Sequence, residues 1–308
     1  MMDTEIDREL LEKIADLLGK PVGAFNIRKD CGCDGRESTE HIKIDNRADG
    51  KSGIDIRILD GTVGETCHIP VIITKPGIEE TVYNDFYIGE NCDVTILSTP
   101  KLGASFVDYL VTVHQSGGNQ SGFGGEGVET FVYVISGKIE AKAEGKTFAL
   151  TQGGYLYCPP GELLTFSNAQ AEDSQLFLYK RRYTPVAGHS PWLVSGNTNQ
   201  LERIHYEGMD DVILLDFLPK ELGFDMNMHI LSFEPGASHG YIETHVQEHG
   251  AYILSGQGVY NLDNQWIPVK KGDYIFMGAY SLQAGYGVGR GEAFSYIYSK
   301  DCNRDVEI

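Results

Sequence analysis

Two histidines, one glutamate and one glutamine are spaced in this sequence as the ligands of a metal ion. Glu243, His245 and His249 stand close together, and Gln283 follows in the next stretch of strand-like sequence. Alternate side chains of a β-strand share a face, so a strand over 243–249 would point all three the same way. Imidazole, carboxylate and carboxamide groups without a thiolate suit Mn²⁺ or Fe²⁺ better than a closed structural zinc site. The set predicts a divalent metal site with positions left open for a substrate or water.

The same residue types on an exposed strand would ordinarily be solvated, so the pattern around them matters. Gly256 and Gly272 bound the two stretches that carry the four residues. The spacing resembles the two motifs of the cupin family, H-x-H-x₃-E-x₆-G and G-x₅-P-x-G-x₂-H. Glu243 stands at the first histidine, His249 at the glutamate and Gln283 at the last histidine. The resemblance implies a mainly β fold with a cupin barrel around the site.

An internal repeat predicts a second barrel. Residues 132–137 align with 251–256 at an offset of 119 residues, which also places Gly153 on Gly272 and Tyr155 on Tyr274. A repeat of this length is a duplicated domain, so we expect two cupin barrels in tandem. The first copy has no metal-ligating set at the corresponding positions, which are Gly124, Glu126, Thr130 and Leu164. We therefore expect metal in the C-terminal barrel alone.

From about residue 90 to the end, the chain resembles the bacterial (S)-ureidoglycine aminohydrolases of allantoin breakdown. The resemblance rests on stretches such as SHGYIETHVQEHGAYILSGQGVYNLD and GDYIFMGAYSLQAGYGVGRGEAFSYIYSKDCNR. It implies one Mn²⁺ per chain on Glu243, His245, His249 and Gln283, a small-molecule substrate, (S)-ureidoglycine, and a homo-oligomer. It also implies site roles for Tyr260, Tyr296 and Lys300.

Roles for these three residues stay open at this stage. Lys300, which the offset of 119 aligns with Arg181, is a candidate for proton transfer or for pairing with the substrate carboxylate, with Tyr296 orienting it. Tyr260 and Tyr296 could equally be packing residues of the barrel. His239 is interpreted as a loop histidine rather than a fifth ligand.

The N-terminal third carries a different resemblance. Residues 23–95, with AFNIRKD, STEHIKI and HIPVIITKPGIEETVYNDFYIGENCDVTI, resemble the front of a SufB/SufD-type iron–sulfur assembly scaffold, which implies a truncated β-helix-like segment. Apolar residues at a helical period over 5–18 predict an amphipathic N-terminal helix. The expected domains are 1–95, a SufB/SufD-like fragment; 96–190, a cupin barrel without metal; and 191–308, the metal-binding cupin barrel.

Composition excludes several classes of partner. The net charge of −19, from 44 acidic and 25 basic residues, argues against nucleic acid and anionic membranes, which need clustered Lys and Arg. No apolar run approaches the ~20 residues that span a bilayer, and the acidic start is unlike a secretory signal, so we expect a cytoplasmic protein. Six scattered cysteines indicate free thiols.

Three functions are consistent with these patterns. The first is a metal-dependent hydrolase that converts (S)-ureidoglycine and water to (S)-ureidoglycolate and ammonia. The second is a non-catalytic ligand-binding cupin, because the hydrolase family's own N-terminal strands are replaced here. The third is a fragmentary iron–sulfur scaffold, which would rest on Cys31, Cys33, Cys67 and Cys92.

Overall fold

The computed structural model describes residues 89–304 and, before them, the strands within 23–27, 33–37, 42–46, 54–59, 67–75 and 78–85. The helix predicted over 5–18 lies outside the described residues. The chain divides into two compact units. One comprises Met1–Thr95, Val111–Ser121 and Thr165–Ser174, and the other comprises Ile96–Leu110, Gly122–Leu164 and Gln175–Ile308.

Short strands with mostly antiparallel pairing make up the N-terminal part of the first unit. One sheet has the order β2-β1-β5-β6, and β4 pairs with β3 and β7. Among the pairs that the structure describes there, only β1 and β5 run parallel. A parallel β-helix needs parallel pairing between successive rungs, so this pairing is not that of a β-helix. The strands are β1 (Gly23–Ile27), β2 (Cys33–Glu37), β3 (Ile42–Asn46), β4 (Ile54–Ile58), β5 (Cys67–Lys75), β6 (Ile78–Asp85) and β7 (Glu90–Ser98).

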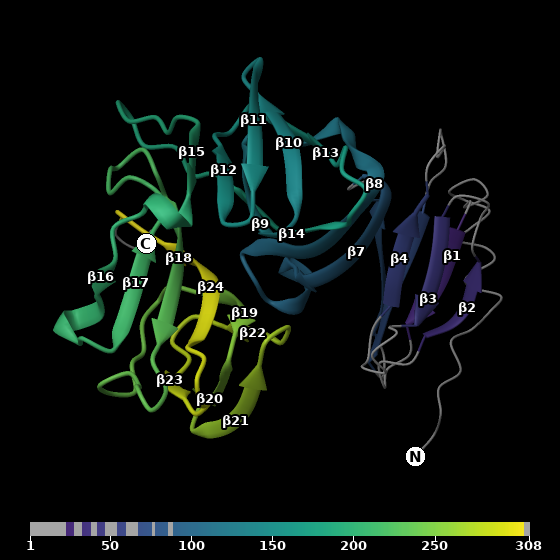
Figure 1. The fold of residues 1–308 in the computed structure, drawn as a ribbon. Helices are drawn as coiled ribbons and strands as arrows, with labels where there is room; N and C mark the ends of the chain where they lie inside the picture. Colours follow the sequence, from purple (N-terminus) through teal and green to yellow (C-terminus); the bar gives the residue numbers. More distant parts are fainter. Residues whose placement is uncertain are drawn as a thin grey trace. The chain divides into compact units, whose positions relative to one another are not determined.

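The first barrel follows, in the teal part of the ribbon (Figure 1). Its strands are hydrogen-bonded in the order β11-β10-β13-β8-β14-β9-β12-β15. The 3₁₀ turn η1 (Pro100–Leu102) precedes them. The strands are β8 (Phe106–Gly124), β9 (Val128–Ser136), β10 (Lys138–Ala143), β11 (Lys146–Thr151), β12 (Gly154–Cys158), β13 (Leu163–Ser167), β14 (Ser174–Arg182) and β15 (Val194–Asn197).

The second barrel occupies the green and yellow part of the ribbon (Figure 1). It consists of a six-stranded sheet, β16-β17-β18-β24-β19-β22, and a three-stranded sheet, β21-β20-β23. Two 3₁₀ turns, η2 (Thr198–Gln200) and η3 (Tyr206–Gly208), lie before and after β16. The strands are β16 (Ile204–His205), β17 (Val212–Asp216), β18 (Met226–Phe233), β19 (His249–Ser255), β20 (Gln257–Leu262), β21 (Gln265–Lys270), β22 (Tyr274–Met277), β23 (Gln283–Gly287) and β24 (Phe294–Asp301).

The duplication read from the sequence is confirmed by the strand order. The neighbours β14-β9-β12 and β11-β10-β13 in the first barrel recur as β24-β19-β22 and β21-β20-β23 in the second. Gly137 and Gly256, which directly follow β9 and β19, have φ of 83° and 70°. Gly153 and Gly272 have φ of 81° and 89°. Such positive φ favours glycine, which explains why these turn positions stand out in the repeat.

The pairing of the last strand of each barrel, β14 and β24, corrects one position in the alignment of the two repeats. In the first barrel Leu178 pairs with Val132, and in the second Tyr298 pairs with Ala251, the residue that the repeat aligns with Val132. The offset on this last strand is therefore 120 residues, because one additional residue lies between β23 and β24. The first-barrel counterpart of Lys300 is thus Lys180, and its alignment with Arg181 was wrong.

Two clusters of buried aromatic and aliphatic residues hold the second unit together. One includes Phe131 and Tyr157 of the first barrel with Phe224 and Met228 of the second, so the two barrels share a core. The other fills the second barrel and includes Tyr260, Tyr296 and Tyr298. Burying one large apolar side chain contributes about 2 kcal/mol, so the cluster fixes the strands that carry the site residues. Within the described residues, the structure contains no helix with the length and apolarity needed to span a bilayer.

Candidate active site

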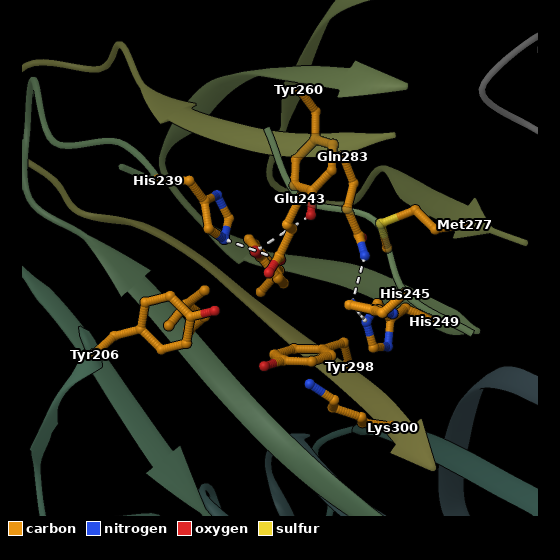
Figure 2. Close-up of a pocket in the computed structure, with 12 residues that line it drawn as sticks. Tyr206, His239, Glu243, His245, His249, Tyr260, Met277, Gln283, Tyr298 and Lys300 are labelled. Carbon is orange, nitrogen blue, oxygen red and sulfur yellow. Dashed lines mark hydrogen bonds and ion pairs between the residues drawn. The ribbon is translucent and has the colours of Figure 1, made fainter. Parts of the chain in front are cut away.

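A small pocket lies inside the second barrel, with an empty volume of about 290 Å³. Its walls come from β18, β19, β20, β22, β23 and β24, together with η3 and the loop between β18 and β19 (Figure 2). The lining residues are Tyr206, Leu231, His239, Glu243, His245, His249, Tyr260, Met277, Gln283, Tyr296, Tyr298 and Lys300.

The segment that carries the predicted ligands is a loop, and the strand predicted over 243–249 was wrong. Only His249, the first residue of β19, lies in a strand, while Glu243 forms an isolated bridge with Gln283 through two backbone hydrogen bonds of 2.9 Å. The His245 carbonyl accepts a hydrogen bond from the Tyr280 amide at 2.8 Å. Residues four apart in a strand are separated by roughly 13 Å, too far for one ion. The loop is what brings His245 next to His249.

His245 and His249 face each other through their Nε2 atoms, which lie 3.2 Å apart. The Nδ1 atom of His249 lies 2.7 Å from the Ser299 carbonyl oxygen, and that of His245 lies 3.1 Å from the Gln247 carbonyl oxygen. A carbonyl oxygen only accepts, so each ring carries its proton on Nδ1. Both Nε2 atoms therefore present lone pairs to the same point.

Both imidazoles are held neutral. Burial, followed by smaller contributions from neighbouring charges including Lys300, lowers the pKa of His249 to about 3. Burial and the nearby Lys300 ammonium also lower the pKa of His245. Neutral imidazole is the form that binds a metal ion. The protonation states and the orientations of both rings are therefore those that metal binding requires.

The residues present fit a divalent cation. Two nitrogens each ~2.1 Å from one ion lie about 3.0 Å apart at a right angle and about 3.4 Å apart at a tetrahedral angle. The observed separation of 3.2 Å falls between these values. Gln283 extends the set, because its amide lies 2.8 Å from His245 Nε2 and can turn to present its oxygen.

Glu243 lines the same pocket, but its carboxylate is turned away from the two imidazoles. Its Oε1 lies 3.8 Å from His239 Nε2, and Figure 2 shows the carboxylate directed toward His239. In the part of the chain that the structure describes, no three His, Cys, Asp or Glu side chains are arranged to hold an ion. The structure thus brings three of the four predicted ligands together and leaves the fourth beside them.

The predicted catalytic residues all line the pocket. The hydroxyls of Tyr260 and Tyr296 lie 3.4 Å apart, and burial raises the pKa of both phenols, so they stay protonated. Lys300 lies beside Tyr298 in Figure 2. Burial also raises the pKa of Tyr298 well above its usual value. The pocket therefore combines protonated phenols with one lysine and one carboxylate.

Three pocket residues were missed or set aside by the sequence reasoning. Tyr298 shares the strand face of Tyr296 and Lys300, so alternation along β24 could have found it. Tyr206 comes from η3, outside the repeat. His239 was interpreted as a loop histidine, but it is buried and accepts a hydrogen bond from the Gly285 amide at Nδ1 (2.7 Å). That contact joins distant segments, and no local pattern signals it.

The corresponding positions of the first barrel hold no comparable set. Thr130 and Leu164 are fully buried, and Glu126 is exposed. Lys180, the counterpart of Lys300, is half-buried with its ammonium 5.6 Å and 5.2 Å from the ring centroids of Tyr109 and Phe123. Thr130 and Leu164 thus stand where the second barrel has His249 and Gln283.

Comparison with known proteins defines the class. The profile of the EutQ-like cupin domain matches residues 102–183, and the profile of the cupin domain matches residues 229–280. The tandem barrels are therefore cupins, as predicted, and the protein is a bicupin. It is 84% identical over 237 residues to the (S)-ureidoglycine aminohydrolase of Escherichia coli strain K12, an alignment that covers 77% of this chain and 90% of that relative. The chain belongs to the (S)-ureidoglycine aminohydrolase family.

A more distant relative and a solved structure are also similar to this chain. The (S)-ureidoglycine aminohydrolase of Arabidopsis thaliana is 29% identical over 228 residues, or 74% of each chain. The crystal structure of protein Ylba from E. coli is 79% identical and superimposes with a TM-score of 0.67, covering 77% of this chain and 92% of that one.

The SufB/SufD-like resemblance has no support from these comparisons, since neither profile reaches residues 23–95. Of the cysteines that a cluster would use, Cys92 is buried, and burial raises its thiol pKa to about 12. A thiol that stays protonated is a poor ligand for iron. The side chains of Cys31, Cys33 and Cys67 lie outside the described residues, and Cys92, Cys158 and Cys302 are free.

Proposed function

We propose that this protein hydrolyses (S)-ureidoglycine in the pocket of its second barrel. The oxygen of water forms a bond to the α-carbon, the carbon–nitrogen bond breaks with its electron pair going to nitrogen, and the products are (S)-ureidoglycolate and ammonia. The observation that carries the activity is the 84% identity to the E. coli enzyme over 90% of its length. The pocket supports it, because its lining includes both a cationic and an anionic side chain, Lys300 and Glu243.

The proposal includes one Mn²⁺ per chain. His245, His249 and Gln283 would hold it. The Nε2 atoms of the two histidines lie 3.2 Å apart with their lone pairs facing each other, and the Gln283 amide lies 2.8 Å from His245 Nε2. Glu243 would complete the set by turning one carboxylate oxygen toward the two imidazoles. When bound, such an ion supplies a positive charge that orients a chelating substrate and stabilises the charge that develops as ammonia leaves.

The chain's own side chains bind and orient the substrate. The Lys300 ammonium is placed to pair with the substrate carboxylate, which fixes the position of the reacting carbon. The phenols of Tyr260, Tyr296 and Tyr298 stay protonated, so they act as hydrogen-bond donors and not as bases. Burial of these rings limits water in the pocket, which strengthens each charge interaction inside it.

Metal analysis coupled to an ammonia-release assay tests this function. The purified protein should contain about one Mn²⁺ per chain and release ammonia from (S)-ureidoglycine. His245→Ala and His249→Ala should each lose both properties, because each removes an imidazole ligand. His189→Ala, which removes an exposed histidine, serves as the control and should keep both.

The same assay separates the hydrolase from a non-catalytic ligand-binding cupin. Metal retained without any ammonia release would reject the hydrolase and favour the binding protein. The homo-oligomer, the cytoplasmic location and the domain limits 1–95, 96–190 and 191–308 stay predictions. Sedimentation of the purified protein tests the first of these.

A further inference from the structure

His239 and Glu243 form a second polar pair at the end of the pocket opposite Lys300 (Figure 2). Both residues come from the loop between β18 and β19. The His239 side chain is 4% exposed and the Glu243 side chain is 21% exposed, with Nε2 and Oε1 3.8 Å apart. This separation is longer than a hydrogen bond, so a small movement of the carboxylate would form or lengthen the contact.

The backbone fixes which nitrogen of His239 carries a proton. The Gly285 amide donates to Nδ1 at 2.7 Å. A proton on Nδ1 would place two donors against each other, so Nδ1 keeps its lone pair and the proton lies on Nε2. The atom that faces Glu243 is therefore an N–H donor, aimed at an acceptor-only carboxylate.

Packing fixes the direction of that donor. The His239 ring stands perpendicular to Tyr206, with centroids 5.9 Å apart, and lies 4.9 Å from the Phe233 ring centroid. The ring is thus held on two sides and by the hydrogen bond at Nδ1. Glu243 has no such constraint on its carboxylate, which is part-exposed and can rotate. The pair therefore combines a rigid donor with a movable acceptor.

We propose that His239 is a positioning residue for Glu243, holding one carboxylate oxygen so that the other faces the ion between His245 and His249. The inference rests on the proposed metal site. A donor that orients a ligating carboxylate typically changes metal affinity by about 10- to 100-fold when it is removed. The hydrogen bond from His239 to the charged carboxylate also restricts the Glu243 side chain in advance, so less conformational entropy is lost when the ion binds.

Two substitutions at one position test the proposal. The amide oxygen of His239→Asn lies close to where Nδ1 does, so it keeps an acceptor for Gly285 and removes the donor to Glu243. The amide nitrogen of His239→Gln reaches closer to the position of Nε2 and restores a donor. Mn²⁺ affinity of the metal-free protein would be measured from the free Mn²⁺ signal in electron paramagnetic resonance, with His205→Gln, an exposed histidine, as the control.

The expected order of affinities is wild type, then His239→Gln, then His239→Asn, with the last weaker by tenfold or more. The control should match wild type. Wild-type affinity in His239→Asn overturns the proposal. A raised KM for (S)-ureidoglycine in His239→Asn at unchanged Mn²⁺ affinity also overturns it, because His239 would then contact the substrate. Failure of the wild type to bind Mn²⁺ would instead reject the metal site, and this inference with it.

A double-mutant cycle guards against a folding defect in His239→Asn. In the Glu243→Gln background the loss of affinity caused by His239→Asn should largely disappear, because the partner it positions has changed. Melting temperatures of the metal-free variants give the structural effect separately. If the two losses add in full, His239 acts on the fold and not through Glu243, and the proposal is wrong.

Discussion

Lys300 is the one lysine or arginine among the residues that line the pocket. A charged hydrogen bond to a substrate carboxylate contributes about 1.5–3 kcal/mol, or roughly 10- to 150-fold in binding. Lys300→Met should therefore raise KM by at least tenfold and leave Mn²⁺ content unchanged. Steady-state kinetics with (S)-ureidoglycine check this.

Lys180→Met is the matched control, because Lys180 occupies the corresponding place in the first barrel, between Tyr109 and Phe123. It should leave both kinetic constants unchanged. A fall in kcat at constant KM in Lys300→Met would contradict carboxylate binding and indicate proton transfer instead.

For single residues, the sequence identified the candidate ligands but not their geometry. Residue type selected His245 and His249, and strand alternation would have added Tyr298. The direction of the Glu243 carboxylate could not be predicted, since it depends on His239, and the place of His239 is set by Gly285 on another strand. Contacts between segments that are distant in sequence leave no local pattern.

Among the elements, the tight turn between β19 and β20 determines how the site strands follow each other. Gly256 has φ of 70°, and a Cβ there would lie 2.4 Å from the Ala293 carbonyl oxygen. The left-handed conformation costs a non-glycine residue about 1–2 kcal/mol, and overpacking costs about 1–3 kcal/mol more. Gly256→Ala should therefore destabilise the protein by about 2–5 kcal/mol in urea denaturation.

Gly145→Ala separates the two costs. Gly145 has φ of 69°, but a Cβ there would meet nothing within 4 Å. Its substitution should cost only the conformational part, about 1–2 kcal/mol. Equal losses in the two variants would show that the contact with Ala293 adds nothing.

Periodicity and the repeat predicted β-strands in both barrels, because strands such as β10 alternate buried and exposed residues. They failed over 243–249, where a loop replaces the expected strand and brings His245 Nε2 within 3.2 Å of His249 Nε2. They also misaligned Lys300 by one residue, since an inserted residue in a turn changes the register without changing the alternation of the strand after it.

For the molecule as a whole, the two barrels are joined by buried polar contacts as well as by their shared core. Arg181 pairs with Asp301, so the ends of the two last barrel strands meet. On another side, the Tyr274 hydroxyl donates to Asp108 at 2.7 Å. Asp108 is fully buried, and its Oδ1 has no hydrogen-bond partner within the described residues.

Burial raises the pKa of Asp108 well above its usual value of 3.8. The folded state therefore keeps a proton that the unfolded state releases as pH rises above 3.8, and the free energy of unfolding falls with increasing pH in that range. The loss can reach about 1.4 kcal/mol per pH unit. Asp108→Asn removes it, so the variant should be more stable than wild type at pH 7, by a margin that shrinks toward pH 4.

Urea denaturation at several pH values between 4 and 7 measures this margin. Asp210→Asn, whose parent side chain is fully exposed, is the control for removing a carboxylate at the surface. A margin for Asp108→Asn that is the same at pH 4 and pH 7 would mean that Asp108 ionises alike in the folded and unfolded chains. In that case the contact with Tyr274 would join the barrels through an ordinary carboxylate, and burial would not change the protonation of Asp108.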